Sequence, residues 1–242
     1  MGSHQPLIQL EGICYGYPGQ GEVLSGLDLF VHPGDRIGLV APNGSGKTTL
    51  FHIIMGLLKP SAGSITLFGN PIKRERDFAE IRHRIGLLFQ DADDQLFSPT
   101  VLEDVAFGPL NMGKSKEEAI EISCKTLERL GLGGFEDRIT YKLSGGEKRM
   151  VALATILAMS PAVLLLDEPT SGLDDQTKNR LKDILLSLDL AYILISHEFE
   201  FLAATTHKIF TMESGRILTD QEIQVHRHEH AHLHGKQPHR HM

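Results

Sequence analysis

Cysteine is scarce in this sequence: Cys14 and Cys124 are the only two among 242 residues. They lie far apart along the chain and form no Cys-x-x-Cys pair. A disulfide framework is therefore not indicated, and we expect two small buried hydrophobic side chains in a protein of a reducing compartment.

A surplus of positive charge is also missing. Lys and Arg number 24 against 31 Asp and Glu, which gives a formal net charge of −7. No basic run is interleaved with aromatic residues, so the chain has no general attraction to the phosphates of DNA or RNA. We therefore expect no nucleic acid among its main partners.

No uninterrupted apolar stretch is long enough to cross a membrane. The most apolar segment, residues 150–166, contains Ser160-Pro161, which divides it into an expected helix and an expected strand. Each is too short for the roughly 30 Å of hydrocarbon in a bilayer. The composition, with 41% hydrophobic residues, is that of a soluble globular chain with a sizeable core. If the protein serves a membrane process, it must dock onto a partner that spans the bilayer.

What the sequence does contain is a glycine-rich turn at residues 41–49, Ala-Pro-Asn-Gly-Ser-Gly-Lys-Thr-Thr. An apolar segment, residues 36–40, precedes it, and an apolar-periodic segment through Leu57 follows it. We expect a strand before the turn and a helix after it, so that backbone N–H groups and the helix N-terminus form a cradle for phosphate. The residues expected to bind a nucleotide in this cradle are Asn43, Gly44, Ser45, Gly46, Lys47, Thr48 and Thr49.

We expect a specific role or backbone conformation at three positions of this turn. Lys47 would reach the β- and γ-phosphates as a point charge, and the Thr48 hydroxyl would ligate the Mg²⁺ that bridges them. Ala41 stands where the usual pattern has its first glycine. An alanine is tolerable there if its backbone keeps φ below zero.

Two carboxylates follow the apolar run of residues 163–166. Asp167 and Glu168 would lie at the C-terminal end of a buried strand, where open α/β sheets bind their ligands. We expect Asp167 to hold Mg²⁺, directly or through water, and Glu168 to polarise the water that attacks the γ-phosphate. A pair of solvated acids opening a turn at Pro169 is the alternative for this stretch taken alone.

A second glycine-rich turn, Leu-Ser-Gly-Gly-Glu at residues 143–147, also opens an expected helix and offers N–H groups to phosphate, but it has no lysine. One nucleotide does not need two cradles in one subunit. If Ser144, Gly145 and Gly146 face a phosphate bound by a second copy, the nucleotide is sandwiched between two subunits; the alternative is an ordinary helix cap.

The order of the expected elements indicates an α/β fold. Antiparallel strands at 7–17 and 23–31 precede the phosphate turn, and continuous apolar runs at 84–89, 162–166, 192–195 and 209–212 favour a mostly parallel sheet covered on both faces. Residues 91–159 are helical in character, with a capping box at Ser115 and Glu118. We expect one domain over residues 5–225, with a core of 5–90 and 160–225, a helical subdomain of 91–159, and a His-rich flexible tail, 226–242.

In order and approximate spacing, these motifs resemble those of the ATPase subunits of ATP-binding cassette (ABC) transporters. The resemblance covers nearly all of residues 7–220 and includes the phosphate turn, Gln90 after a strand, residues 143–147, 163–168 and 171–174, and His197. It implies a P-loop NTPase core with an antiparallel β subdomain and a helical subdomain, ATP and Mg²⁺ as cofactors, and ATP hydrolysis as the activity.

The resemblance also implies roles for single residues. Gln90 would couple the γ-phosphate and Mg²⁺ to a transmembrane partner, Asp174 would communicate across a dimer, and His197 would contact the γ-phosphate. Tyr17 matches the aromatic residue that stacks on adenine; Tyr15 is the less favoured candidate, and core packing is the alternative for both. The expected catalytic set is thus Lys47, Gln90, Glu168 and His197, and the expected Mg²⁺ ligands are Thr48, Gln90 and Asp167.

Residues 93–109 narrow the resemblance further. Asp-Asp-Gln-Leu-Phe-Ser-Pro-Thr-Val at 93–101 and Glu-Asp-Val-Ala-Phe-Gly-Pro at 103–109 look like the energy-coupling-factor subclass, especially its cobalt and nickel uptake ATPases. In that subclass this region adjoins the surface that receives helices of the membrane partner. The resemblance implies a peripheral protein on the cytoplasmic face of the cell membrane, working with a transmembrane coupling protein and a substrate-specific membrane component, as a homodimer or with a paralogous ATPase.

Alternating histidines near the end of the chain suggest a metal. Neutral imidazoles suit Ni²⁺, Co²⁺, Cu²⁺ or Zn²⁺, and the interspersed Arg227 and Glu229 argue against an engineered tag. A solvated tail without a metal is the other alternative. The candidate ligands for Ni²⁺ or Co²⁺ are His226, His228, His230, His232 and His234.

The sequence therefore predicts an ATP-hydrolysing subunit of a membrane importer for cobalt or nickel ions. A vitamin importer of the same subclass is the closest alternative. A soluble ABC ATPase of DNA repair or translation usually has a long coiled-coil or zinc insertion, or two cassettes, and this sequence has neither. A P-loop kinase or GTPase is disfavoured, because no Asn-Lys-x-Asp motif is present and those enzymes lack an equivalent of residues 143–147.

Overall fold

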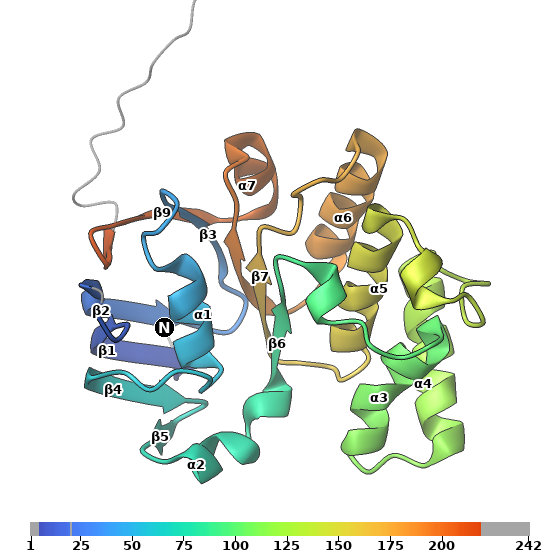
Figure 1. Ribbon diagram of the computed structural model, residues 1–242, viewed down its shortest axis with the longest axis horizontal. Coiled ribbons are helices and arrows are strands. Elements are labelled where there is room, and N and C mark those ends of the chain that lie inside the picture. The colour runs from blue at the N-terminus through green and yellow to red at the C-terminus, as the bar shows by residue number, and fades with distance from the viewer. Residues whose placement is uncertain (1–4, 20, 219–242) are drawn as a thin grey trace, which may run out of the picture.

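The computed structural model describes residues 5–19 and 21–218, which form an α/β fold built on two sheets (Figure 1). The strands are Ile8–Gly16 (β1), Glu22–Val31 (β2), Arg36–Val40 (β3), Ala62–Leu67 (β4), Asn70–Ile72 (β5), Ile85–Leu88 (β6), Val163–Asp167 (β7), Ala191–Ile195 (β8), Lys208–Glu213 (β9) and Arg216–Leu218 (β10). The α-helices are Lys47–Ile54 (α1), Glu75–Ala79 (α2), Val101–Asn111 (α3), Lys116–Arg129 (α4), Gly145–Leu157 (α5), Asp175–Ser187 (α6) and Phe199–Thr205 (α7), and short 3₁₀ turns lie at Arg82–Arg84 (η1), Ala92–Asp94 (η2) and Thr140–Lys142 (η3).

The two sheets differ in strand direction. The first has the order β2-β1-β4-β5 and is antiparallel throughout. The second has the order β10-β9-β3-β8-β7-β6; its strands are parallel except for β10, which pairs antiparallel with β9. This arrangement confirms the predicted antiparallel strands before the phosphate turn and the mostly parallel sheet after it.

The register of the parallel sheet places the functional loops at one edge. Asp167 at the end of β7 is paired with Ile195 at the end of β8, and Leu39 of β3 is also paired with Ile195. The segments that follow β3, β7 and β8 therefore leave the sheet side by side, which is where open α/β sheets bind ligands.

Helix α1 lies between the two sheets (Figure 1). Its buried apolar residues, which include Leu50 and Ile53, belong to one core cluster with Leu10 of β1 and Ile37 of β3. Burying both sides of a short helix fixes its N-terminus, and hence the phosphate turn, against the sheet edge.

The helix after the phosphate turn is shorter than the apolar period predicts. We expected it to continue through Leu57, but α1 ends at Ile54 and Leu57 is 52% exposed. Gly56 adopts φ of 70° just beyond the end of the helix. A left-handed glycine terminates a helix, so Leu57 is directed out of the core.

Residues 91–159 contain α3, α4 and α5 together with η2 and η3 (Figure 1). The predicted capping box at the start of α4 is present, with Ser115 and Glu118 bonded to each other's backbone N–H. Ala119 and Leu127 of this helix are fully buried, and Gly131 follows its end with φ of 65°. The predicted capping box is thus confirmed, and the helix buries one apolar face and ends before a left-handed glycine.

Pro161 separates a helix from a strand, as predicted. Helix α5 ends at Leu157 and β7 begins at Val163. Among residues 5–19 and 21–218, the structure contains no helix that has both the length and the apolar character needed to traverse a bilayer.

The prediction that both cysteine side chains are buried was wrong. Both are free thiols that are partly exposed, not fully buried. Cys14 Sγ accepts a hydrogen bond of 3.2 Å from the N–H of Gly26, so this side chain has a polar contact near the surface of the first sheet. The His-rich segment predicted as a tail, residues 226–242, lies outside the described residues.

Candidate nucleotide site

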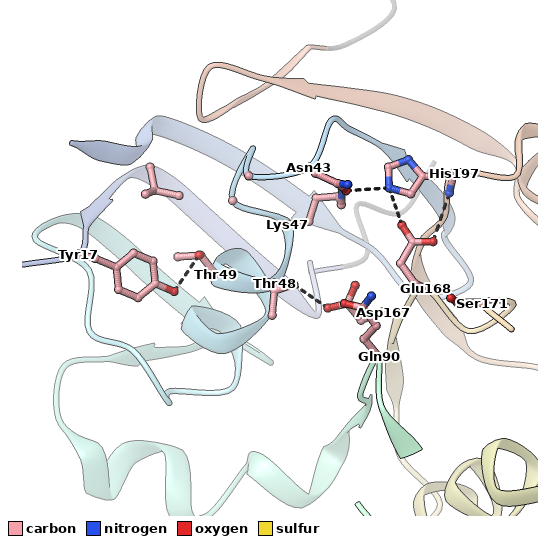
Figure 2. Close-up of a pocket in the computed structure, with 13 residues that line it drawn as sticks. Tyr17, Asn43, Lys47, Thr48, Thr49, Gln90, Asp167, Glu168, Ser171 and His197 are labelled. Atoms are coloured by element: carbon pink, nitrogen blue, oxygen red, sulfur yellow. Dashed lines mark hydrogen bonds and ion pairs between the residues drawn. The ribbon is translucent and has the colours of Figure 1, made fainter. Parts of the chain in front are cut away.

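A cavity of about 480 Å³ opens at the sheet edge where β3, β6, β7 and β8 end (Figure 2). It brings together side chains from the first sheet, the phosphate turn and the loops after three parallel strands. Its lining residues are Tyr17, Val23, Asn43, Gly44, Gly46, Lys47, Thr48, Thr49, Gln90, Asp167, Glu168, Ser171 and His197. Most of the residues predicted separately along the sequence therefore share one cavity; Val23 and Ser171 are additions.

The phosphate turn has the backbone that its glycines predict. Gly44 and Gly46 adopt φ of 79° and 98°, and a Cβ on Gly46 would lie 2.8 Å from Leu24 and 2.9 Å from Val23. A side chain there would force the Leu24 and Val23 side chains to move, and the positive φ would be strained for any residue other than glycine. Ala41 is not among the residues with positive φ, so the condition under which alanine is tolerable at this position is met.

Lys47 is held by its own turn. Its ammonium donates to the carbonyl oxygens of Ala41, at 2.7 Å, and Pro42, at 3.1 Å. The side chain is 9% exposed and lines the cavity. A buried cation whose hydrogen bonds go to neutral carbonyls is available to bind an anion that enters the cavity.

Thr48 and Asp167 join the phosphate turn to the end of β7. The Thr48 hydroxyl donates to Oδ2 of Asp167 at 2.8 Å (Figure 2). Burial raises the pKa of the Asp167 carboxyl, while the hydrogen bond from Thr48 and the charge of Lys47 act in the opposite direction. The hydroxyl and the adjacent cation thus favour the carboxylate that a metal ion needs.

These oxygens fit Mg²⁺. The Thr48 hydroxyl, the Asp167 carboxylate and the Gln90 side chain line one cavity, and hard oxygen ligands are those that Mg²⁺ prefers. In the described part of the chain, no group of three or more His, Cys, Asp or Glu side chains is arranged to hold a metal alone.

Glu168 has an unusual backbone and is in contact with a histidine. Its φ is 46°, a left-handed conformation that is uncommon for a residue with a side chain. One carboxylate oxygen accepts the backbone N–H of His197 at 3.3 Å, and the other lies 3.2 Å from Nε2 of the same histidine. That ring nitrogen also lies 3.2 Å from Oδ1 of Asn43, so the three side chains meet across the cavity (Figure 2). Local strain of this kind is common at functional sites.

Tyr17 is the aromatic residue that faces the cavity. Its hydroxyl lies 3.1 Å from Oγ1 of Thr49, within hydrogen-bonding distance. Tyr15 packs edge-on against it with ring centroids 5.0 Å apart and contacts the core cluster. The structure thus places Tyr17, and not Tyr15, where a base bound beside the phosphate turn could stack.

Arg149 is a residue of this region that the sequence analysis did not identify. It extends from α5, is 7% exposed, and donates to the carbonyl oxygens of Phe89 and Gln90 at 2.6 and 2.5 Å. Burial lowers its pKa, and Asp91 and Asp167 oppose that shift. Arg149 therefore anchors the segment that carries Gln90 to α5. The signal in the sequence is a cation, next to Lys148, that directly precedes the apolar residues of α5.

Ser144, Gly145 and Gly146 do not line the cavity. They lie at the N-terminus of α5, where Ser144 and Gly145 are exposed and a Cβ on Gly145 would meet no atom within 4 Å. Asp174 is the N-cap of α6 and accepts the N–H of Thr177 at 3.0 Å. Ser45 lines a neighbouring pocket on the other side of the phosphate turn. Residues 144–146 thus form a helix N-terminus, a geometry that suits anions, outside their own chain's cavity.

Comparisons with known proteins agree with this geometry. The sequence profile of the ABC transporter family matches residues 24–171. The energy-coupling factor transporter ATP-binding protein EcfA of Methanothermobacter thermautotrophicus is 41% identical over 218 residues, which cover 88% of this chain and 70% of that protein.

Two solved structures are similar over most of both chains. CbiO1 from Clostridium perfringens, described as part of the ABC transporter complex CbiONQ, superposes with a TM-score of 0.78 and 33% identity, covering 89% of this chain and 88% of that chain. The dimeric structure of MJ0796, a bacterial ABC transporter cassette, gives a TM-score of 0.79 and 26% identity, covering 87% of this chain and 96% of that chain.

Proposed function

Because this chain belongs to the ABC transporter family, as an ATPase of the energy-coupling-factor type, we propose that it clamps ATP between two cassettes and hydrolyses it to drive import of cobalt or nickel ions. The observation that carries the proposal is the single cavity that contains Tyr17, Lys47, Thr48, Asp167, Glu168 and His197. ATP and Mg²⁺ are the cofactors of this family of ATPases.

The proposal assigns the binding of ATP to three parts of the cavity. Tyr17 stacks on the adenine, the backbone N–H groups of the phosphate turn hold the phosphates, and Lys47 exchanges the Ala41 and Pro42 carbonyls for phosphate oxygens. Thr48, Asp167 and Gln90 hold Mg²⁺. Mg²⁺ held by these residues would supply positive charge that stabilises the transferring phosphoryl group.

Glu168 is the proposed general base. Its carboxylate orients the attacking water and accepts a proton from it as the water oxygen bonds to the γ-phosphorus. His197 contacts both oxygens of Glu168 at 3.2 and 3.3 Å, so it fixes the direction of the carboxylate and brings a donor toward the γ-phosphate. Lys47 stabilises the charge on the phosphate oxygens.

A second cassette completes the site in this proposal. Ser144 and Gly145 of the 143–147 turn are exposed and do not line their own chain's cavity, as a contribution to a partner's nucleotide would require. The dimeric cassette MJ0796, at 26% identity, supports such pairing. The partner is either an identical copy or a paralogue. In both cases each subunit would bind one nucleotide through the phosphate turn at Lys47 and would contact the other nucleotide through Ser144.

The membrane partner is proposed to dock in a second hollow, which we call the apolar groove. This groove, of about 720 Å³, is lined by residues of α2, η1, β6, α3 and α5 and of the loops between them. Phe97, in the loop before α3, and Phe107, on α3, are among them. Those two rings pack edge to face at 4.8 Å and are 68% and 47% exposed. Exposed aromatic side chains around a hollow are typical of a protein interface. We propose that a helix of a transmembrane coupling protein occupies the groove and holds the ATPase peripherally on the cytoplasmic face of the membrane.

The cargo assignment has separate support. Residues 93–109 resemble cobalt and nickel uptake ATPases, and CbiO1, part of the complex CbiONQ, is 33% identical to this chain. His226, His228, His230, His232 and His234 are proposed to bind Ni²⁺ or Co²⁺, and they lie outside the described residues. Deleting this chain should abolish high-affinity cobalt or nickel uptake by cells; loss of uptake of a vitamin alone would contradict the metal assignment.

The ATPase mechanism is tested by Glu168→Gln. This variant should bind ATP with unchanged affinity, hydrolyse it at least about 100-fold more slowly, and accumulate an ATP-bound dimer in size-exclusion chromatography. Glu200→Gln, which changes an exposed acid on α7, is the matched control. Wild-type phosphate release by Glu168→Gln would remove Glu168 from the role of general base.

A further inference from the structure

The 143–147 turn contains a negative charge where a phosphate is proposed to bind. The hydroxyl and the backbone N–H of Ser144 both donate to Oε2 of Glu147, each at 2.8 Å. The N–H of Glu147 points back to the Ser144 hydroxyl oxygen at 3.3 Å. In this arrangement the hydroxyl proton that could be donated to a phosphate is occupied by a carboxylate of the same turn.

Glu147 is held in its charged form. Hydrogen bonds from the N–H and hydroxyl of Ser144, and the adjacent Arg138, lower the pKa of the Glu147 carboxyl. An anion at this position repels the phosphates of a nucleotide that approaches the N-terminus of α5. The favourable field of the helix terminus is therefore opposed by a charge in its own first turn.

Arg138 is the counter-charge of Glu147. Its guanidinium donates to Oε1 of Glu147 at 2.9 Å, the oxygen that Ser144 does not use. The same guanidinium lies over the ring of Phe135, 3.5 Å from its centroid. The Arg138 backbone is fixed as well, because its N–H donates to the carbonyl of Phe135 and its own carbonyl accepts the N–H of Val101. The ion pair is half exposed but starts from an anchored backbone.

We propose that Arg138 is a positioning residue for the phosphate of a nucleoside triphosphate bound by the second cassette. Its guanidinium balances the negative charge of Glu147. It also keeps the Glu147 carboxylate in place when the Ser144 hydroxyl rotates away from Glu147 to donate to the incoming phosphate. Glu147 then keeps an ionic partner after losing a hydrogen-bond donor, and the helix terminus presents no uncompensated negative charge. This inference rests on the two-cassette site proposed above.

An ordinary surface ion pair is the competing account. Such pairs contribute little to stability, and this account predicts no effect of Arg138 on ligand binding by another subunit. The two accounts differ in one respect. If Arg138 acts through the charge of Glu147, removing that charge must make Arg138 dispensable; if it acts by packing on Phe135, it must matter equally in both backgrounds.

The experiment uses the full chain in the Glu168→Gln background and measures the ATP concentration that gives half-maximal dimer by analytical ultracentrifugation. Arg138→Gln should raise this concentration about tenfold. In the presence of Glu147→Gln, whose amide oxygen can still accept from Ser144, Arg138→Gln should raise it less than about twofold. Arg138→Lys keeps the charge and should stay close to the parent protein.

Two controls separate charge compensation from damage to the fold. Lys125→Gln breaks an exposed ion pair with Glu121 on α4 and should leave dimer formation unchanged. Binding of a fluorescent ATP analogue to the monomer reports the Lys47 cradle, which Arg138→Gln should not alter. A fall in thermal stability with equal effects in both Glu147 backgrounds would mark Arg138 as a packing residue and overturn the proposal.

Failure of the inference and failure of the proposed function give different results. If Glu168→Gln forms no dimer with ATP, the two-cassette site itself is wrong and the inference falls with it. If ATP forms the dimer at the same concentration with and without Arg138, only the role of Arg138 is wrong.

Discussion

The hydroxyl of Thr48 donates a hydrogen bond of 2.8 Å to the carboxylate of Asp167, across 119 positions of sequence. One residue lies in the first turn of α1 and the other ends β7, so the bond joins the phosphate turn to the parallel sheet before any ligand arrives. Both groups are proposed Mg²⁺ ligands. The hydrogen bond therefore holds the two proposed metal-binding side chains close together before Mg²⁺ binds. Fewer side-chain rotations then have to be fixed when the ion binds.

Thr48→Val removes a proposed metal ligand and this hydrogen bond while keeping the volume of the side chain. We expect Mg²⁺-dependent ATP binding to weaken about 10- to 100-fold and the free energy of unfolding to fall by about 1–3 kcal/mol, because Asp167 loses its donor in a buried site. Calorimetric titration with ATP should be compared in Mg²⁺ and in EDTA. Thr66→Val on β4, outside the cavity, is the matched control. Equal losses in Mg²⁺ and EDTA would show that Thr48 does not act through the metal.

Tyr17 is predicted to contribute to binding through its ring. Tyr17→Ala should weaken ATP binding about tenfold, as expected for loss of a base-stacking surface. Tyr17→Phe keeps the ring and loses only the contact with Thr49, so its effect should be about threefold or less. Competition by inorganic tripolyphosphate, which has no base, is the control and should be the same in both variants. A tenfold loss for tripolyphosphate in Tyr17→Ala would instead indicate damage to the phosphate turn.

Asp104 predicts a specific dependence of stability on pH. It is 2% exposed and accepts the N–H groups of Phe97 and Ser98 through Oδ1, at 3.1 and 2.9 Å, while Oδ2 has no partner within the described residues. Burial raises the pKa of this carboxyl despite those hydrogen bonds. Its contribution to stability is therefore fully present below its unfolded pKa, about 3.9, and is lost as pH rises through the higher folded pKa.

Asp104→Asn should accordingly gain stability relative to the wild type as pH rises from about 4 to 7. Urea unfolding at several pH values measures this difference. Asp77→Asn is a control of opposite sign, since the N–H groups of Lys73 and Arg74 lower the pKa of Asp77. Asp77→Asn should lose stability relative to the wild type as pH rises toward about 4, the unfolded pKa, and its difference from the wild type should change little above that pH. Parallel pH trends for the two variants would contradict the assignment for Asp104.

Phe97 and Phe107 predict the position of the membrane partner. Replacing both by Ala should reduce copurification with the membrane component at least about tenfold, since buried aromatic anchors dominate interface affinity. ATP binding by the isolated chain should be unchanged, because neither residue lines the nucleotide cavity. Phe199→Ala changes a ring on α7 that is 63% exposed and outside the apolar groove. If Phe199→Ala removes the partner and the double variant does not, the docking site is elsewhere.

The fold was predictable where local sequence determines it. Gly44, Gly46 and Lys47 form a turn whose conformation depends on the glycines themselves, and Pro161 ends a helix by steric exclusion. The prediction was wrong at Leu57, where the apolar period continued but the left-handed Gly56 ended the helix first. Periodicity gives the buried face of a helix, but a single backbone angle can decide its length.

Contacts between distant segments were not predictable in the same way. Arg149 bonds the carbonyls of Phe89 and Gln90 across 60 and 59 positions, and nothing in the local pattern of either segment specifies the other. Arg138 and Glu147 are only nine positions apart, yet neither a helix period nor a strand period brings them together. The strand order that gathers the loops into one cavity likewise depends on packing of the whole sheet.

The bonds from Lys47 to its own turn affect how nucleotide is released. The Lys47 ammonium has two hydrogen-bond acceptors, the Ala41 and Pro42 carbonyls, within the turn itself. If Lys47 binds phosphate as proposed, departure of ADP would require only that the lysine return to those carbonyls, with no refolding of the loop. A turn built in this way can be emptied and refilled in every cycle at little conformational cost, as rapid turnover of a fuel requires.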